Sequence, residues 1–210
     1  DVYKRQIMFF TLEGSEGVGK STLIESLKDF FKENKIDFLF TREPGGTKEG
    51  QEIRKILLDQ SLDLNPYMET FLLLADRIQH VEKIIRPALQ KNKHVLSDRY
   101  VESTFAYQGA GRGLNQRELE GFIKNLNFPK PNLTIYLDLP VQEGLKRVKN
   151  RGKMDRFEKE DLIFFEKIRN FYLDLVKKDP QRYFLIDASI PVDEVFRQAK
   201  DRILKELNEQ

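Results

Sequence analysis

The 210-residue chain contains no cysteine and only two histidines. The absence of cysteine excludes disulfides, thiolate metal sites and cysteine nucleophiles, and it suits a reducing compartment. Two histidines are too few for a multi-histidine metal site. An excess of one charge is missing as well, because 36 Lys and Arg residues are offset by 34 Asp and Glu residues. The net charge of +2 is too small to predict a nucleic-acid or membrane surface, so we expect neither partner.

Long apolar runs are also missing. The longest, residues 7–10 and 71–75, are far shorter than the ~20 residues that cross a bilayer, so we expect no transmembrane segment. The first six residues resemble the translation of a sequencing adaptor, and we expect residues 1–7 to be a non-native extension. A start at Met8 leaves no room for a signal peptide, so we expect a cytoplasmic protein with one domain, residues 8–210.

Apolar runs alternate with amphipathic stretches along the chain, and this pattern predicts an α/β protein. The expected strands are residues 7–12, 37–41, 95–97, 133–137 and 183–186. The expected helices are residues 20–32, 48–59, 65–87, 115–125, 141–150, 158–178 and 192–207. Strands that alternate with helices predict a parallel sheet with helices on both faces. Residues 149–158 are highly charged and poor in apolar side chains, so we expect a mobile insertion there.

Residues 14–21, with the sequence GSEGVGKS, match the P-loop pattern G-x-x-x-x-G-K-[ST]. The motif lies between an expected strand and an expected helix, where backbone N–H groups and the helix dipole converge on polyphosphate oxygens. Gly14 and Gly19 let the backbone approach a phosphate closely. Lys20 supplies a charge for the β- and γ-phosphates, and Ser21 offers its hydroxyl to Mg²⁺. The motif therefore predicts a nucleoside triphosphate site.

Two features test whether this P-loop serves a GTPase or a motor ATPase. The guanine-reading pattern N-K-x-D occurs at residues 34–37, but it follows the first helix instead of a late strand, so we interpret it as a helix-ending turn. Two apolar stretches that end in aspartate, residues 95–98 and 135–138, are both candidates for a Walker B strand.

Two arginines follow expected strands and indicate a second anionic substrate. Arg42 lies at the end of the second strand, and Arg99 follows the third. Ligands bind at the carboxyl edge of open α/β sheets, and the guanidinium fork matches phosphate oxygens. Two arginines beside one P-loop are typical of a nucleotide kinase.

The chain resembles bacterial thymidylate kinase from Met8 to about Leu207. The segments that carry the resemblance are the P-loop, residues 41–47 (TREPGGT), 75–77 (ADR), 98–100 (DRY), 106–109 (AYQG) and 155–158 (DRFE), and Ser103. The resemblance implies a P-loop nucleoside monophosphate kinase fold, a five-stranded parallel sheet in the order 2-3-1-4-5 flanked by helices. A short lid at about residues 146–158 and a homodimer formed through long helices are also implied. The implied reaction transfers phosphate from ATP to dTMP, forms ADP and dTDP, and uses Mg²⁺.

The resemblance also assigns site residues. The implied ATP-binding residues are Gly14, Ser15, Glu16, Gly17, Val18, Gly19, Lys20, Ser21, Thr22, Arg147 and Arg151. The implied substrate-binding residues are Glu16, Arg42, Arg54, Leu73, Arg77, Arg99, Thr104, Tyr107 and Gln108. The implied catalytic residues are Lys20, Arg99 and Arg151, and Mg²⁺ would meet Ser21 directly and Asp98 through water.

Three of these residues have distinct implied roles. Glu16 would accept a hydrogen bond from the sugar 3′-hydroxyl, since a solvated acid with no such role would be repelled by polyphosphate. Arg77 would donate to a carbonyl of the thymine. Tyr107 would crowd the 2′ position of the sugar and favour deoxyribose. Arg42, Arg54 and Arg99 would contact the acceptor phosphate.

The sequence departs from the family at two positions. Leu73 stands where many members carry a phenylalanine that stacks on thymine, and Phe71 lies on another side of the expected helix. Gly17 stands where some members carry an arginine in the P-loop. We therefore expect the compensating positive charge to come from Arg151 in the lid.

Two alternatives to a dTMP kinase remain at this stage. The first is a kinase for another pyrimidine nucleoside monophosphate, which Leu73 favours. The second is a P-loop switch module that hydrolyses nucleotide slowly, although that reading leaves Arg42 and Arg99 without a role. The dependence of turnover on the acceptor nucleotide separates the three.

Overall fold

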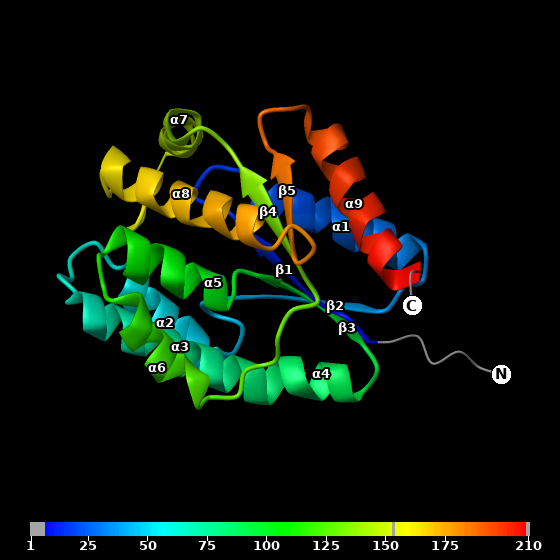
Figure 1. The fold of residues 1–210 in the computed structure, drawn as a ribbon, viewed down its shortest axis with the longest axis horizontal. Coiled ribbons are helices and arrows are strands. Elements are labelled where there is room, and N and C mark those ends of the chain that lie inside the picture. Colours follow the sequence, from blue (N-terminus) through cyan, green and yellow to red (C-terminus); the bar gives the residue numbers. More distant parts are fainter. Residues whose placement is uncertain (1–6, 153, 209–210) are drawn as a thin grey trace.

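Five parallel strands form one sheet in the order β2-β3-β1-β4-β5, as expected (Figure 1). The computed structural model describes residues 7–152 and 154–208, so the expected extension lies outside the described residues except for Ile7. The strands are β1 (Phe9–Glu13), β2 (Phe38–Arg42), β3 (His94–Asp98), β4 (Leu133–Asp138) and β5 (Tyr183–Asp187). Each differs by one or two residues at its ends from the stretch expected from the sequence.

Helices cover both faces of the sheet. They are α1 (Lys20–Glu33), α2 (Lys48–Leu58), α3 (Pro66–His80), α4 (Arg86–Gln90), α5 (Val101–Thr104), α6 (Gln116–Lys124), α7 (Val141–Arg151), α8 (Leu162–Lys178) and α9 (Val192–Asn208). Two π-helical stretches, η1 (Val81–Ile85) and η2 (Phe105–Gly111), lie between them. In the described part of the chain, no helix is long and apolar enough to cross a membrane.

Side-chain alternation in β1 divides the core between the two faces. Phe10 and Leu12 pack with α1 and α9, which lie side by side on one face (Figure 1). Phe9 packs with η1 and α4 on the opposite face. All five residues of β1 are buried, as expected for the central strand of a parallel sheet. The side chain of Glu13 lies on the same face of the sheet as that of Phe9, because the two residues are four apart in one strand. It therefore extends toward the face that η1, α4, α5 and α8 cover.

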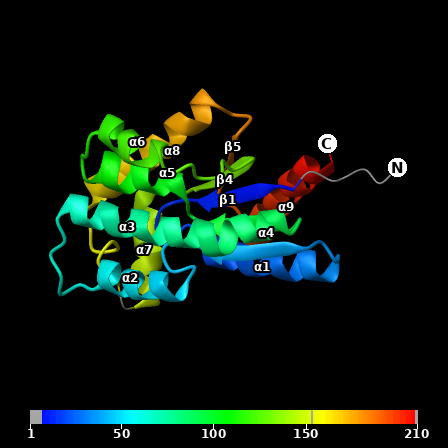
Figure 2. The ribbon, with the colours of Figure 1, turned by 90° about the horizontal axis from the view of Figure 1, so that it is seen from below.

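Two helical segments differ from the sequence prediction. The expected helix 65–87 runs on to Gln90 as α3, η1 and α4, which Figure 2 shows as one continuous rod. Pro87 has no N–H to donate, so the regular hydrogen-bond ladder is interrupted and the turn before it is π-helical. Residues 101–111, which are not among the expected helix ranges, form α5 and η2. Their glycines and β-branched residues are poor helix formers, and contact with α8 compensates.

The expected lid also differs in detail. Residues 146–151 belong to α7, and α8 begins at Leu162 instead of residue 158. Asp161 caps α8, because its carboxylate accepts a hydrogen bond of 2.7 Å from the N–H of Phe164. The connection between α7 and α8 therefore spans residues 152–161. The turn at residues 34–37 confirms the helix-ending interpretation, since Asn34 is the C-cap of α1 and Lys35 has φ +55°.

Candidate active site

A cavity of about 450 Å³ opens at the carboxyl edge of the sheet. Its walls come from the P-loop, the ends of β2 and β3, the helices α2, α3, α5 and α7, the η2 stretch, and the connection after α7. Every site residue expected from the sequence lines this cavity except Gly14 and Ser15, which form the base of the P-loop. Residues separated by up to 135 positions, such as Glu16 and Arg151, thus meet at one place.

At two positions in the P-loop, Gly14 and Gly17, a Cβ atom would collide with a neighbouring carbonyl oxygen. Gly14 has φ +150°, and a Cβ there would lie 2.9 Å from the carbonyl oxygen of Leu137. Gly17 has φ +75°, and its Cβ would lie 2.2 Å from the carbonyl oxygen of Gly144 in α7. A larger residue at position 17 would therefore require the P-loop and α7 to separate.

Lys20 is the first residue of α1 and folds back over the P-loop. Its Nζ donates hydrogen bonds to the carbonyl oxygens of Gly14 at 2.8 Å and Ser15 at 3.1 Å. Burial, together with the nearby charge of Arg99, lowers the pKa of Lys20 from 10.5 to about 8. The ammonium group is thus poorly solvated where it is held, and an anion placed in the cavity would stabilise its charge.

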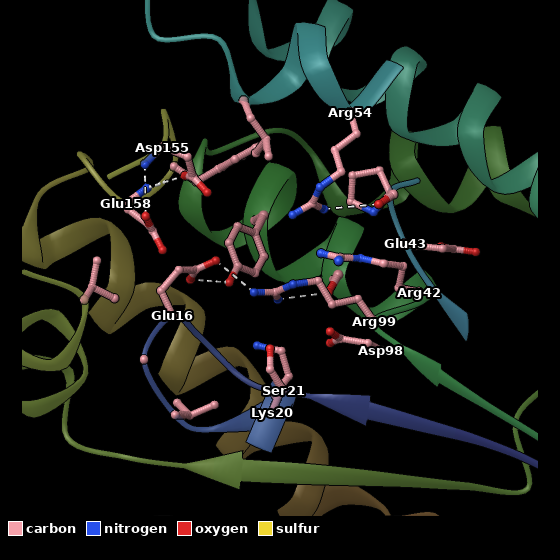
Figure 3. Close-up of a pocket in the computed structure, with 18 of the residues that line it drawn as sticks. Glu16, Lys20, Ser21, Arg42, Glu43, Arg54, Asp98, Arg99, Asp155 and Glu158 are labelled. Carbon is pink, nitrogen blue, oxygen red and sulfur yellow. Dashed lines mark hydrogen bonds and ion pairs between the residues drawn. The ribbon is translucent and has the colours of Figure 1, made fainter. Parts of the chain in front are cut away.

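Arg99 is held at the end of β3 in a left-handed conformation with φ +68°. Its N–H donates to the carbonyl of Leu12 at 2.9 Å, and its own carbonyl accepts from the Ser97 hydroxyl at 2.8 Å. Nη2 of Arg99 donates to Oε1 of Glu16 at 2.8 Å, and the Tyr107 hydroxyl donates to Oε2 of the same carboxylate at 2.6 Å (Figure 3). Glu16 is therefore oriented by two partners from β3 and η2.

Three arginines are directed into the same part of the cavity, namely Arg42, Arg54 and Arg99 (Figure 3). Arg54 donates to the carbonyl of Pro44 at 3.1 Å, and burial together with the charges of Arg42 and Arg99 lowers its pKa. Within the described residues the guanidinium of Arg42 has no hydrogen-bond or ion-pair partner. These cations repel one another, so a phosphate group between them would relieve the repulsion.

Arg77 of α3 lines the cavity and is 2% exposed. Its Nε donates to Oε2 of Glu43 at 2.6 Å, Nη1 to the Thr104 hydroxyl at 2.8 Å, and Nη2 to the Tyr100 carbonyl at 2.8 Å. The other oxygen of Glu43 contacts Nδ1 of His80 at 2.8 Å. Three hydrogen bonds therefore fix the direction of the Arg77 guanidinium.

Leu73 lines the cavity beside Arg77, whereas Phe71 does not. Phe71 is 52% exposed, and its ring packs against Phe122 of α6 at 5.1 Å. The aromatic residue nearest to Leu73 in sequence therefore faces away from the cavity.

Three arginines of the expected lid, Arg147, Arg151 and Arg156, have different surroundings. Arg147 lies 3.4 Å from the carbonyl oxygen of Ala188, and Arg151 forms an ion pair with Glu158. The side chain of Arg151 is 63% exposed, so the ion pair leaves it free to move toward a ligand. Arg156 lies apart from the cavity wall and contacts Glu69 of α3.

The sequence analysis missed several acidic and aromatic residues of the site. Glu43, Asp76, Asp155, Phe157 and Glu158 also line the cavity. All five lie within motifs that we had already singled out, so position inside those motifs was a usable signal.

Glu13 is a further missed residue, fully buried at the end of β1. Its carboxylate accepts hydrogen bonds from the Tyr100 N–H at 2.8 Å and from the Ser103 and Tyr172 hydroxyls, both at 2.7 Å. Burial and the nearby charge of Glu102 raise the pKa of Glu13 to about 7. Nothing in the sequence distinguishes this acid from a surface residue, because its partners come from distant elements.

The raised pKa makes stability depend on pH. A carboxyl group with pKa 4.5 in the unfolded chain and about 7 in the folded protein stabilises the fold at low pH and loses that contribution as pH rises from 4.5 to 7. We expect the unfolding free energy of Glu13→Gln, relative to wild type, to increase by roughly 3 kcal/mol over this range. Urea unfolding at pH 4.5 and 7.5 measures the difference. Glu25→Gln, at an exposed position of α1, is the control, and a pH-independent difference for Glu13→Gln would contradict the assignment.

Comparisons with known proteins identify the family of the chain. The family model described as thymidylate kinase matches residues 12–199. The thymidylate kinase of Acinetobacter baumannii (strain SDF) is 45% identical over 91% of this chain and 98% of that protein. That of Pseudomonas fluorescens Pf-5 is 45% identical over 96% and 97%, and that of Kosmotoga olearia is 39% identical over 94% and 95%.

A solved structure is similar throughout the fold. The crystal structure of thymidylate kinase from Ehrlichia chaffeensis superposes with a TM-score of 0.75 and 28% identity, covering 94% of this chain and 98% of that chain. Sequence and fold therefore lead to one conclusion. The chain belongs to the thymidylate kinase family.

Proposed function

We propose that the cavity binds ATP and dTMP together and transfers the γ-phosphoryl group of ATP to dTMP, which forms ADP and dTDP. Family membership makes the chain a nucleoside monophosphate kinase, a phosphotransferase. The observation that carries the residue assignment is the convergence of Lys20, Arg42, Arg54 and Arg99 on one cavity beside the P-loop. Phosphoryl transfer depends mainly on positioning and on positive charge near the transferring group, and these cations supply both. The absence of cysteine suits a cytoplasmic location for this reaction.

In this proposal the two substrates occupy opposite ends of the cavity. The P-loop amides and Lys20 bind the ATP phosphates, and Arg42, Arg54 and Arg99 bind the phosphate of dTMP. Glu16 lies between the two ends and accepts a hydrogen bond from the sugar 3′-hydroxyl. Tyr107 contacts the same carboxylate, so its ring packs close to the sugar and leaves little room for a 2′-hydroxyl.

The residues beside Lys20 also fit a magnesium ion. Oδ1 of Asp98 is buried without a hydrogen-bond partner among the described residues, and Ser21 lines the same cavity. Mg²⁺ takes oxygen ligands and keeps several waters, which suits one hydroxyl and one carboxylate. Ser21 and Asp98 would hold the ion, and its charge would neutralise the β- and γ-phosphates of ATP.

Arg151 supplies the lid charge in this proposal. The backbones of Gly17 and Gly144 are in contact, so a P-loop arginine at position 17 has no room for its Cβ. Arg151 ends α7, lines the cavity and is itself 63% exposed; among the described residues its side chain pairs with Glu158 alone. We assign it to the transferring phosphoryl group for these reasons.

The thymine end of the cavity has fixed donors but no aromatic stacking partner from α3. Arg77 uses three of its five N–H groups inside the protein and has the others for a base carbonyl. Leu73 provides an apolar contact where stacking is common in the family, and Phe71 is directed elsewhere. Thr104 and Gln108 complete the polar contacts.

An acceptor panel tests the proposed function. ADP formation is measured with dTMP, dUMP, dCMP and AMP and without acceptor, each with ATP and Mg²⁺. We expect rapid turnover with dTMP and at most slow turnover without acceptor. Turnover on dUMP or dCMP but not on dTMP would establish the alternative pyrimidine kinase, and hydrolysis that no acceptor changes would establish the switch module.

We further propose that the chain forms a homodimer through α3 and its neighbours. Large apolar side chains are exposed there, namely Ile56 (38%), Tyr67 (41%), Met68 (50%), Phe71 (52%) and Ile78 (40%). An exposed apolar patch on paired helices is typical of a subunit interface.

Phe71→Glu is expected to dissociate this dimer, because it places a charge in the apolar patch. Light scattering after size exclusion should then report the mass of one chain, 24.8 kDa, instead of twice that value. Ile163→Glu is the matched control, since Ile163 is 64% exposed on α8, away from α3. A wild-type mass of one chain would overturn the proposal.

A further inference from the structure

Glu69 of α3 is a fully buried carboxylate that lies behind the cavity wall and is not part of it. Its Oε1 accepts hydrogen bonds from Nε2 of Gln108 at 2.7 Å and from Nε of Arg112 at 3.2 Å. Its Oε2 accepts from Nη2 of Arg112 at 3.2 Å and from Nη2 of Arg156 at 2.5 Å. One carboxylate therefore joins η2 to the connection between α7 and α8.

This contact decides how the side-chain amide of Gln108 is oriented. A carboxylate that faces two guanidinium groups accepts hydrogen bonds and donates none, so Gln108 must present its NH₂ group to Glu69. Its carbonyl oxygen then lies on the other side of the amide. Gln108 lines the cavity, and its Oε1 is buried without a partner in the described part of the chain. Buried acceptors are rarely left unpaired, so this oxygen indicates a donor on the ligand.

The orientation matters for base selection. Thymine and uracil carry an N3–H donor, whereas cytosine has an unprotonated N3 acceptor in the same place. A fixed Gln108 carbonyl oxygen accepts a hydrogen bond from the N3–H of thymine or uracil. With cytosine the same oxygen faces the N3 acceptor, and no hydrogen bond can form. Arg77 and Thr104 line the cavity near Gln108 and provide donors for the base carbonyls.

We propose that Glu69 is a positioning residue for base selection: it holds the Gln108 amide with its carbonyl oxygen toward the base, so that the cavity prefers pyrimidines with an N3–H donor. This inference rests on the proposed function, because it concerns the acceptor end of the same cavity. Glu69 does not touch the substrate and acts through Gln108.

The contact between Arg156 and Oε2 of Glu69 provides a control for the experiment. Arg156 binds that oxygen, and its Nε donates to the carbonyl of Leu57 at 2.8 Å. The neighbouring Phe157 lines the cavity and packs edge-on against Tyr107 at 5.9 Å. Arg156→Gln therefore disturbs the same carboxylate from the lid side while the bond between Glu69 and Gln108 is kept.

The test measures kcat/KM for dTMP and for dCMP in wild type, Glu69→Gln, Gln108→Leu and the double variant. A glutamine at position 69 can donate or accept a hydrogen bond, so the Gln108 amide can flip and exchange the positions of its oxygen and nitrogen. We expect the preference for dTMP over dCMP to fall at least about ten-fold in Glu69→Gln. In the Gln108→Leu background the same substitution should leave the preference unchanged, and Arg156→Gln should leave it unchanged in the wild-type background.

Two results would overturn the proposal: an unaltered preference in Glu69→Gln, or an equal fall in the presence and absence of Gln108. If Glu69→Gln does not fold, Glu69→Asp keeps the charge for the two arginines but shortens the reach to Gln108, and the same fall is expected. The failure of the proposed function is distinct, because wild type would then not phosphorylate dTMP at all.

Discussion

Lys20→Met is expected to lower kcat by at least ~10²–10³-fold without destabilising the fold. The ammonium group of Lys20 lies over the P-loop, held by the carbonyls of Gly14 and Ser15. It supplies a positive charge close to the phosphates, and one preorganised donor at that place has a large effect on the transition state. Methionine has a similar length and no charge, so it removes this contribution with little change in shape.

The lowered pKa of Lys20 predicts the sign of the stability effect. A lysine with pKa 10.5 in the unfolded chain and about 8 in the folded protein contributes stability above pH 10.5 and loses it as pH falls through 8. At pH 7 the charge therefore opposes folding, and its removal offsets the two lost hydrogen bonds. Urea unfolding at pH 7 should show a loss of no more than about 1 kcal/mol.

Lys28→Met is the matched control, because Lys28 lies on the same helix, 42% exposed, and pairs with Glu25. It should keep wild-type turnover. If Lys20→Met retained kcat within ten-fold of wild type, or unfolded far more easily, the role assigned to Lys20 would be wrong.

Arg151→Ala is expected to lower kcat by ~10³-fold or more, with little change in the KM for dTMP and in the unfolding temperature. Arginines that reach the transferring phosphoryl group have effects of this size because they offset charge that develops in the transition state. The Arg151 side chain is 63% exposed, and Glu158 keeps a hydrogen bond from the Asp155 N–H when Arg151 is removed, so the loss of stability should be small. Single-turnover measurements with ATP and dTMP isolate the chemical step.

Lys149→Ala provides the control for Arg151→Ala. It removes a positive charge from the same last turn of α7, at a position that does not line the main cavity. Normal turnover in this variant would show that general lid charge is not responsible. Near-normal turnover in Arg151→Ala would instead mean that another cation serves the transition state, and Arg147 would be the next candidate.

Local patterns in the sequence were enough to predict the sheet, its order through the family resemblance, and most of the cavity wall. Gly14 and Lys20 were identified from the P-loop pattern, and Arg42 and Asp98 were singled out because each ends an expected strand or follows it directly. The carboxyl ends of parallel strands meet at one edge, so residues in those positions converge whatever the details of packing. The main errors, at α5, η2 and the start of α8, concern segments whose helical state depends on contacts or on a single capping residue.

The sequence by itself determined the type of site, because phosphate binding uses backbone geometry and cations that occupy characteristic positions in the chain. Only the tertiary structure decided how those groups are oriented. It placed Gly17 against Gly144, buried Glu13 beneath the end of β3, and set Glu69 behind Gln108. These contacts join residues far apart in the chain, and an isolated buried acid has no local signature. Its effect comes from desolvation and from the partners that packing brings to it.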